Sequence, residues 1–253
     1  MESDAPAFRP DVDTEDADAA IRGDADAGLY WLRGDEEPAS RFLAELAGSG
    51  RALEFGIGDG RIALPLAEHG VEVAGIDLSA EQIRLLRSKP GGSAIEVVVG
   101  DMTSAVVAGR YSLVYTVFNS ILNLRTQNDQ LRCFENAARH LDQGGAFVVE
   151  AAVPTAWTDE YAYVRPRWIG QDGVALNVCR YDPASQLFVE NVVRLASDGI
   201  SSRAHEYRLI WPSEMDLMAR LAGLTPAERW GGWHKEPFTA ESTLHVSVYL
   251  RGA

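Results

Sequence analysis

The stretch that decides the fold reads LeuGluPheGlyIleGlyAspGlyArgIle and spans residues 53–62. An apolar strand is predicted over 51–55, and it runs directly into glycines 56, 58 and 60. Glycine adopts positive φ without a steric penalty, so glycines at this spacing let the backbone bend sharply and approach a ligand closely. Apolar residues at helical spacing follow over 61–69, and the start of a helix offers unpaired N–H groups. The segment therefore predicts a strand, a ligand-binding loop and a helix in succession.

The spacing of the glycines argues against a nicotinamide or flavin site. The dinucleotide fingerprint GxGxxG requires a third glycine at position 61, where Arg61 stands. Glu54 lies two residues before Gly56 and places a carboxylate over the same crevice. An unpaired carboxylate is costly in a buried strand, which favours a function for Glu54. These features predict a ligand that lacks phosphates and carries a positive charge.

Strands and helices alternate beyond this segment. Continuous β-branched runs separated by helices indicate a parallel sheet that is buried on both faces. Ser79 is a predicted N-cap, with Gln82 three residues on. Gly144 and Gly145 are expected to end the preceding helix. The predicted strands are 71–76, 95–99, 111–117 and 146–151, and the predicted helices are 38–46, 80–88 and 127–141.

The pattern changes after Glu150. Three strand-like segments, 174–181, 187–196 and 201–211, are separated by turn sequences. We therefore predict an antiparallel insertion, called the lid below, over residues 155–211. A helix over 212–223, with Ser213 as a possible cap, and a last strand over 243–250 complete the α/β chain.

Charge is concentrated at the start of the chain. The 253 residues have a net charge of −14, and residues 1–26 hold nine acidic residues against two arginines. Such a run predicts a solvated arm, or an arm that folds over a ligand, ahead of a main domain over 27–253. The acidic balance disfavours nucleic-acid partners. The sequence has no apolar run of membrane-spanning length, no signal-peptide pattern and only two cysteines, so we expect a cytoplasmic protein that acts on a small molecule.

Further landmarks follow the glycine segment in order, each at a predicted strand. Asp77 stands 17 residues after Gly60, GlyAspMet occupies 100–102, PheAsnSer occupies 118–120, and a glycine pair opens the strand segment 144–150. Ligands bind at the carboxyl ends of the strands in open α/β sheets. With these landmarks, residues 30–253 resemble the class I S-adenosylmethionine-dependent methyltransferases.

The resemblance implies a Rossmann-like seven-stranded sheet with the lid inserted after strand five. It also implies S-adenosylmethionine as cofactor and S-adenosylhomocysteine as product. Asp77 is then expected to accept hydrogen bonds from the ribose hydroxyls, although it could instead cap the next helix. Asp101 is expected to accept a hydrogen bond from the adenine amine. The cofactor-binding residues so implied are Glu54, Gly56, Gly58, Gly60, Asp77, Leu78, Asp101, Met102, Phe118 and Tyr30.

Within that family the chain is most similar to enzymes that methylate amino sugars and lincosamide-like antibiotics. Tyr30 and Trp31 would then close the cofactor pocket near the sulfonium, the alternative being that they are core residues of a short helix. His205 is the first candidate for a catalytic base or substrate-orienting residue, although a single histidine is more often structural. The substrate-binding residues expected are Asn119, Trp157, Tyr161, Trp168 and His205, with Tyr163 as a further lid aromatic that could instead only cover the sheet.

Methyl transfer from a sulfonium is an in-line displacement that depends on alignment. A neutral amine needs little else, whereas a hydroxyl needs a general base, for which imidazole suits neutral pH. A methyltransferase-like cyclase or a binding protein that retains the cofactor without transfer is the alternative function. We expect no metal dependence, no membrane partner, and a monomer or a homodimer.

Overall fold

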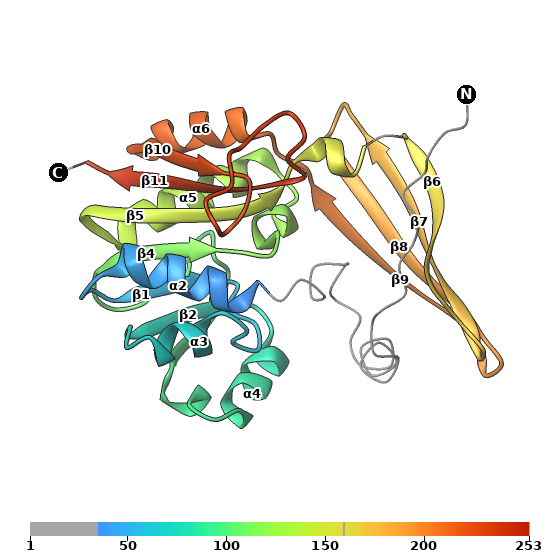
Figure 1. The fold of residues 1–253 in the computed structure, drawn as a ribbon, viewed down its shortest axis with the longest axis horizontal. Coiled ribbons are helices and arrows are strands. Elements are labelled where there is room, and N and C mark those ends of the chain that lie inside the picture. The colour runs from blue at the N-terminus through green and yellow to red at the C-terminus, as the bar shows by residue number, and fades with distance from the viewer. Residues whose placement is uncertain (1–34, 159, 253) are drawn as a thin grey trace. The chain divides into compact units, whose positions relative to one another are not determined.

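The computed structural model describes residues 35–158 and 160–252. Their strands form a seven-stranded sheet in the order β10-β11-β5-β4-β1-β2-β3 and a four-stranded sheet in the order β6-β7-β8-β9 (Figure 1). The predicted fold class, an α/β sheet with an antiparallel insertion, is confirmed. The acidic arm predicted over 1–26, and the candidate residues Tyr30 and Trp31, lie outside the described residues.

Five strands form the parallel part of the large sheet. They are β1 (Ala52–Phe55), β2 (Val73–Asp77), β3 (Glu96–Val99), β4 (Tyr111–Thr116) and β5 (Leu141–Ala152). Strand β1 pairs in parallel with both β2 and β4. The order of the strands reverses between β1 and β4, and in open α/β sheets this switch point is where ligands bind.

Two further strands extend this sheet beyond β5. Strand β11 (Leu244–Arg251) runs antiparallel between β5 and β10 (Leu224–Trp230). The sequence predicted the first of these and missed the second. Pro226 and a register shift next to it interrupt the period-2 pattern of β10, so no strand pattern is visible there.

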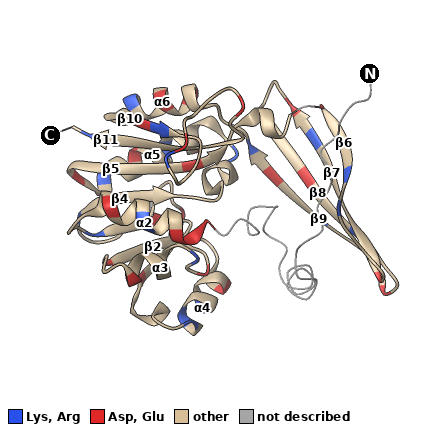
Figure 2. Ribbon diagram, in the orientation of Figure 1, with Lys and Arg blue, Asp and Glu red and all other residues tan. Residues whose placement is uncertain are grey.

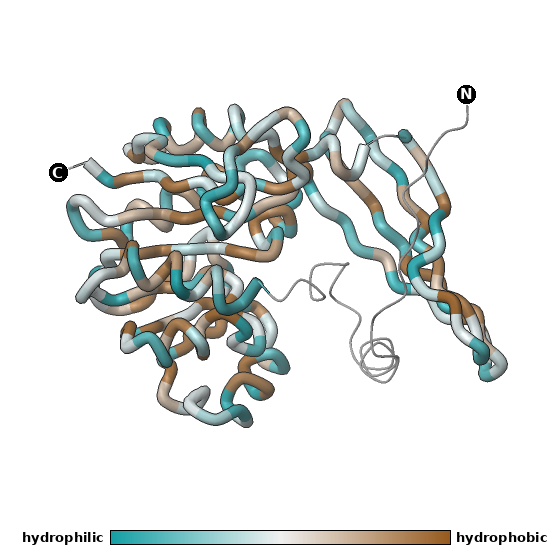
Figure 3. The backbone as a smooth tube through the Cα atoms, in the orientation of Figure 1, coloured by the Kyte–Doolittle hydropathy of each residue, from teal (hydrophilic) through white to brown (hydrophobic). Residues whose placement is uncertain are grey.

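Helices cover both faces of the large sheet and create two apolar cores. One core joins α2 (Glu36–Ala47) and α3 (Ala63–Glu68) to the sheet, and the other joins α5 (Gln127–His140) and α6 (Pro212–Leu221) to the opposite face. Helix α4 (Ala80–Ser88) begins at Ser79, whose side chain accepts from the Gln82 N–H as predicted. The short 3-10 helices are η2 (Gly92–Ala94), η3 (Ser120–Asn123) and η4 (Pro154–Ala156). Charged residues of both signs occur on helices and strands alike (Figure 2), and hydrophobic stretches follow the strands (Figure 3).

Two predicted element ends differ from the structure. Helix α5 ends at His140, and Gly144 and Gly145 lie inside β5 instead of closing the helix. Gly144 has φ +76°, and the β4–β5 register shifts between Tyr111 and Leu113, so the glycine pair marks an irregularity of the sheet. Ser213 does not cap α6, because Trp211 is the N-cap and Pro212 is the first helical residue.

The lid contains four strands joined as consecutive hairpins, one more than predicted. They are β6 (Ala162–Gly170), β7 (Gly173–Asp182), β8 (Leu187–Ala196) and β9 (Gly199–Arg208). Strand β6 was missed because Pro166 interrupts it. The structure accommodates Pro166 because β6 is an edge strand and its register shifts between Pro166 and Trp168.

Within residues 35–158 and 160–252, none of the helices combines the length and the apolar composition that a membrane span requires.

Candidate functional site

The glycine loop lies between β1 and α3 at the switch point of the sheet. Gly56, Gly58 and Gly60 all have positive φ, between +54° and +81°. A Cβ at Gly60 would lie 2.3 Å from Leu86 Cδ1, whereas a Cβ at Gly58 would meet no atom within 4 Å. A side chain at Gly60 would have to displace Leu86, while the backbone at Gly58 faces open space that a ligand can approach.

Asp77 ties this loop to the end of β2. Its Oδ2 accepts the Gly58 N–H at 2.7 Å and its Oδ1 accepts the Ser79 N–H at 2.7 Å. Helix capping falls to Ser79, as expected. Each carboxylate oxygen accepts more than one hydrogen bond, so Asp77 can still receive hydroxyl donors from a ligand.

Apolar side chains follow the carboxylates at the ends of β2 and β3. Leu78 follows Asp77 and is 71% exposed, which is unusual for a leucine next to a buried strand. At the end of the neighbouring β3, Asp101 accepts the Thr103 N–H at 2.8 Å, and Met102 is half-buried. The ends of β2 and β3 thus present two carboxylates and two apolar side chains, a set suited to a hydroxyl-rich, amine-bearing heterocycle.

Glu54 has a buried partner that the sequence did not reveal. Its side chain is 2% exposed, and Oε2 accepts the Tyr115 hydroxyl at 2.9 Å between β1 and β4. Burial raises the pKa of Glu54 well above its usual value, and Asp77 and Asp59 raise it further. A cationic ligand at this edge would favour the ionised form.

The segment after β4 is a strained turn. Phe118 and Asn119 both have positive φ, +51° and +62°, a conformation that is costly for residues other than glycine. The buried Glu150 holds this turn by accepting the Phe118 N–H at 2.8 Å, and Asn119 Oδ1 accepts the Ala152 N–H at 2.7 Å. The Arg61 guanidinium lies 4.3 Å from the centre of the Phe118 ring. Glu150 was not among the predicted site residues, although an acidic residue inside the apolar run 146–152 is the signal that could have found it.

One face of the lid carries the predicted histidine. His205 on β9 pairs directly with Glu190 on β8, so the two side chains share a face. Phe188 and Tyr207 lie two residues from them along the same strands, on that same face. Trp157, which follows η4, packs on Phe188 and Tyr207 at ring distances of 5.2 and 5.6 Å. This surface, the inner face, therefore turns towards the segment that follows β5.

The other predicted lid aromatics occupy different environments. Tyr163 is half-buried on β6 and packs against the core, whereas Tyr161 is 72% exposed. Trp168 lies on β6 opposite Ala175, with its ring against Gly170. The structure thus brings Trp157 next to Tyr207, whose ring stacks on that of His205, and leaves Tyr161 open to solvent. All the expected substrate contacts stay predictions, namely those of Asn119, Trp157, Tyr161, Trp168 and His205.

The remaining histidines are separate from this face. His140 is buried and forms hydrogen bonds with the Val107 N–H and the Asn136 carbonyl. His245 is fully buried against Ser247, and burial lowers its pKa to about 3. His69 and His234 are exposed. Among residues 35–158 and 160–252, no group of three or more His, Cys, Asp or Glu side chains is placed to hold a metal ion.

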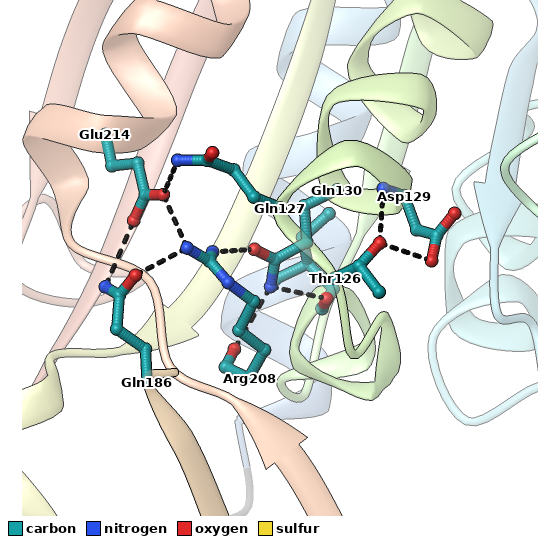
Figure 4. A network of polar contacts seen from close by, with 8 residues as sticks. Thr126, Gln127, Asp129, Gln130, Gln186, Arg208 and Glu214 are labelled. Carbon is teal, nitrogen blue, oxygen red and sulfur yellow. Dashed lines mark hydrogen bonds and ion pairs between the residues drawn. The ribbon is translucent and has the colours of Figure 1, made fainter. Parts of the chain in front are cut away.

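A buried polar network anchors the base of the lid (Figure 4). Arg208, at the end of β9, is 5% exposed and donates to Gln130 on α5, Gln186 before β8 and Glu214 on α6. Gln130 returns a bond to the Arg208 carbonyl at 3.0 Å, and Gln127 donates to Glu214 at 2.7 Å. No local sequence pattern indicates this network, which joins the end of β9 to α5 and α6 where the lid leaves the core.

The carboxylates and the glycine loop fit S-adenosylmethionine. Glu54 can face its cationic methionine portion, Asp77 its ribose hydroxyls, and Asp101 its adenine amine. The open backbone at Gly58 permits close approach, and the exposed Leu78 provides apolar surface for the adenine ring. The positive charge, the ribose hydroxyls and the adenine of that ligand thus have chemically suited side chains at the ends of β1, β2 and β3.

Comparisons with known proteins agree with this site. Residues 52–145 match the family model described as "Methyltransferase domain". The structure resembles the CcbJ methyltransferase from Streptomyces caelestis with a TM-score of 0.81 and 33% identity, covering 87% of this chain and 90% of that one. The cypemycin N-terminal methyltransferase from a Streptomyces species is 27% identical over 79% of this chain and 82% of its own length.

A more distant structure supports the fold. CalS10, an amino pentose methyltransferase from Micromonospora echinaspora, has a TM-score of 0.67 and 20% identity, covering 97% of this chain and 99% of its own. The match to CcbJ extends over both the large sheet and the lid because it covers nearly the whole of each chain. The chain therefore belongs to the class I S-adenosylmethionine-dependent methyltransferases.

Proposed function

We propose that this methyltransferase transfers the methyl group to an amine or hydroxyl of a small natural product or sugar-like metabolite. The observation that carries the proposal is the inner face of the lid, which presents His205 and a cluster of aromatic rings next to the segment that follows β5. The similarity to the cypemycin N-terminal methyltransferase supports a nitrogen acceptor on a natural product.

The cofactor would be held by the residues at the ends of β1, β2 and β3. When bound, S-adenosylmethionine supplies a methyl group on a positively charged sulfur and leaves as S-adenosylhomocysteine. Glu54 faces the positive charge, Asp77 and Asp101 accept hydrogen bonds, and Phe118 lies beside the methionine portion. Tyr30, which we expect near the sulfonium, lies outside the described residues.

The acceptor would lie between the turn after β4 and the inner face of the lid. The rate of an in-line displacement depends on holding the attacking atom in line with the methyl group and the sulfur. Asn119, Trp157, Tyr161 and Trp168 are the proposed wall of this site, and His205 takes a proton from a hydroxyl or from a protonated amine. A positioned general base contributes roughly a hundredfold to ten-thousandfold in rate.

Calorimetry of cofactor binding, followed by a transfer screen, tests the proposal. We expect wild-type protein to bind S-adenosylmethionine and S-adenosylhomocysteine, Asp77→Ala to lose most of this affinity, and Asp142→Ala, at an exposed position of β5, to keep it. Methyl-labelled cofactor is then offered to amino sugars, peptide amines and hydroxylated natural products. Binding without transfer to any of them would favour the alternative, a cofactor-retaining cyclase or binding protein.

A further inference from the structure

A single row of polar side chains crosses the inner face of the lid. The strand pairings align Tyr163 on β6 with Cys179 on β7, Cys179 with Glu190 on β8, and Glu190 with His205 on β9. Directly opposed residues on antiparallel strands have Cβ atoms about 4.5–5.5 Å apart. Glu190 and His205 are therefore adjacent, with their side chains on the same face.

Glu190 lies in a shielded position next to the cationic side chain of Arg167. Its side chain is 13% exposed, and its Oε1 lies 3.8 Å from Nη1 of Arg167, which is 12% exposed. Burial raises the pKa of Glu190, while the positive charges of Arg167 and of protonated His205 act in the opposite direction. A carboxylate in such a position interacts more strongly with its neighbours than one in water does.

The imidazole of His205 is also restrained from its own strand. The rings of His205 and Tyr207 stack at 6.3 Å with an interplanar angle of 21°. Tyr207 packs in turn on Trp157 at 5.6 Å, so the stack continues to the segment after β5. The inner face therefore restrains the plane of the imidazole on one side and places a carboxylate on the neighbouring strand.

We propose that Glu190 is a positioning residue that orients His205 and stabilises its protonated form. The inference rests on the proposed function, in which His205 receives the proton of the acceptor. In that step the lone pair of the acceptor N or O bonds the methyl carbon, and the methyl–sulfur bond breaks with its electrons on sulfur. The acceptor proton passes to an imidazole nitrogen, and the imidazolium then faces the Glu190 carboxylate. The positive charge of Arg167 favours the ionised form of that carboxylate.

Other charged groups share this face and set the background for the titration of His205. Among the described strands, the other titratable and charged side chains that the pairings place on the inner face are Tyr163, Arg165, Arg167, Cys179, Tyr181, Arg194, Arg203 and Tyr207. Glu190 is the one carboxylate among these groups of the described chain. Removing Glu190 should therefore shift the titration midpoint of His205 in the opposite direction to removing an arginine.

The test is an NMR titration of the His205 imidazole in the full-length protein without cofactor. We expect Glu190→Gln to move the titration midpoint of His205 to lower pH by about one unit or more. Arg167→Gln should move it to higher pH. Glu206→Gln, which removes a carboxylate from the opposite face of β9, should leave it nearly unchanged. If the titration midpoint of His205 is the same in Glu190→Gln as in wild type, the proposal is wrong. Should Glu190→Gln fail to fold, Arg167→Gln serves as the test, and an unchanged midpoint in that variant would contradict the proposal.

Kinetics separate this inference from the function on which it rests. With a hydroxyl acceptor, Glu190→Gln should lower kcat on the order of tenfold while cofactor affinity stays unchanged, and Glu190→Asp should restore part of the rate. The acid limb of its kcat profile should move to lower pH together with the His205 titration. A shifted titration combined with wild-type transfer by His205→Ala would overturn the role of His205 as base. Unchanged kcat in Glu190→Gln would overturn the role of Glu190 in positioning.

Discussion

Arg208 should be the residue on which the attachment of the lid depends most. Its guanidinium donates to Gln130, Gln186 and Glu214, which lie on α5, in the turn before β8 and on α6. Hydrogen bonds that involve a charged group contribute about 1.5–3 kcal/mol each. Three bonds at the low end sum to about 4.5 kcal/mol, within the range of about 3–5 kcal/mol for removing one partner of a buried ion pair. We therefore predict that Arg208→Met lowers the free energy of unfolding by about 3–5 kcal/mol.

Denaturation with urea, followed by tryptophan fluorescence and by circular dichroism, measures this change. Arg180→Met, at an exposed position of β7, is the matched control and should cost less than about 0.5 kcal/mol. Combining Arg208→Met with Glu214→Gln should cost less than the sum of the single changes, because the two side chains interact directly. A loss below about 1 kcal/mol in Arg208→Met would refute the reasoning, since it would fall to the level of a surface ion pair.

The same network predicts a pH dependence. Burial alone would raise the pKa of Glu214, but hydrogen bonds from Arg208, Gln127 and Gln186 outweigh it and hold that pKa below its ordinary value. A carboxyl with a depressed folded pKa stabilises the protein above its unfolded pKa, and this stabilisation is lost as pH falls through the folded value. In Arg208→Met, Glu214 keeps the amide donors of Gln127 and Gln186 but loses its cationic partner, so burial favours its protonated form more than in the wild type. The stability difference between wild type and Arg208→Met should therefore shrink on acidification, and a constant difference from neutral to acidic pH would contradict the assignment.

Three further predictions concern the cofactor edge. Gly60→Ala should lower the thermal stability of the protein, because its Cβ would meet Leu86. Gly58→Ala should cost about 1 kcal/mol in backbone strain and mainly weaken cofactor binding. Thermal unfolding measures the first effect, and calorimetry of cofactor binding measures the second. Burial raises the pKa of Glu54, so cofactor binding should release a proton from it and the affinity for the cofactor should rise with pH. Glu54→Gln should lose this pH dependence. Calorimetry in buffers of different ionisation enthalpy measures the number of protons released. Glu150→Gln should lower kcat more than it weakens cofactor binding, because it loosens the turn after β4, and equal losses in both would contradict that role.

The elements predicted correctly have strong local patterns. The parallel strands read as continuous apolar runs, and Ser79 begins α4 through a cap that is visible in the sequence. Strand β6 and the glycines inside β5 were misread because Pro166 and Gly144 usually interrupt regular structure. Both are accommodated here by register shifts that depend on the neighbouring strand.

Contacts between distant residues were beyond the sequence. Glu54 and Tyr115 are 61 residues apart, and Gln130 and Arg208 are 78 apart. Their pairing follows from the order of strands in the sheet and from the path of the lid, which local patterns do not encode. The acids at the ends of β1, β2 and β3 were identified because the resemblance placed them at strand ends, and the structure brings those ends to one edge.

Transfer of a labelled methyl group to a defined acceptor atom tests the central claim most directly. The enzyme is supplied with S-adenosylmethionine labelled with ¹³C at the methyl group and with matched pairs of amine and hydroxyl acceptors, and the product is located by NMR. We expect the label to appear on nitrogen or oxygen of one acceptor class, and Asp77→Ala to abolish the product. Binding of the cofactor with no labelled product from any acceptor, or a label attached to carbon, would contradict the proposed transfer to nitrogen or oxygen.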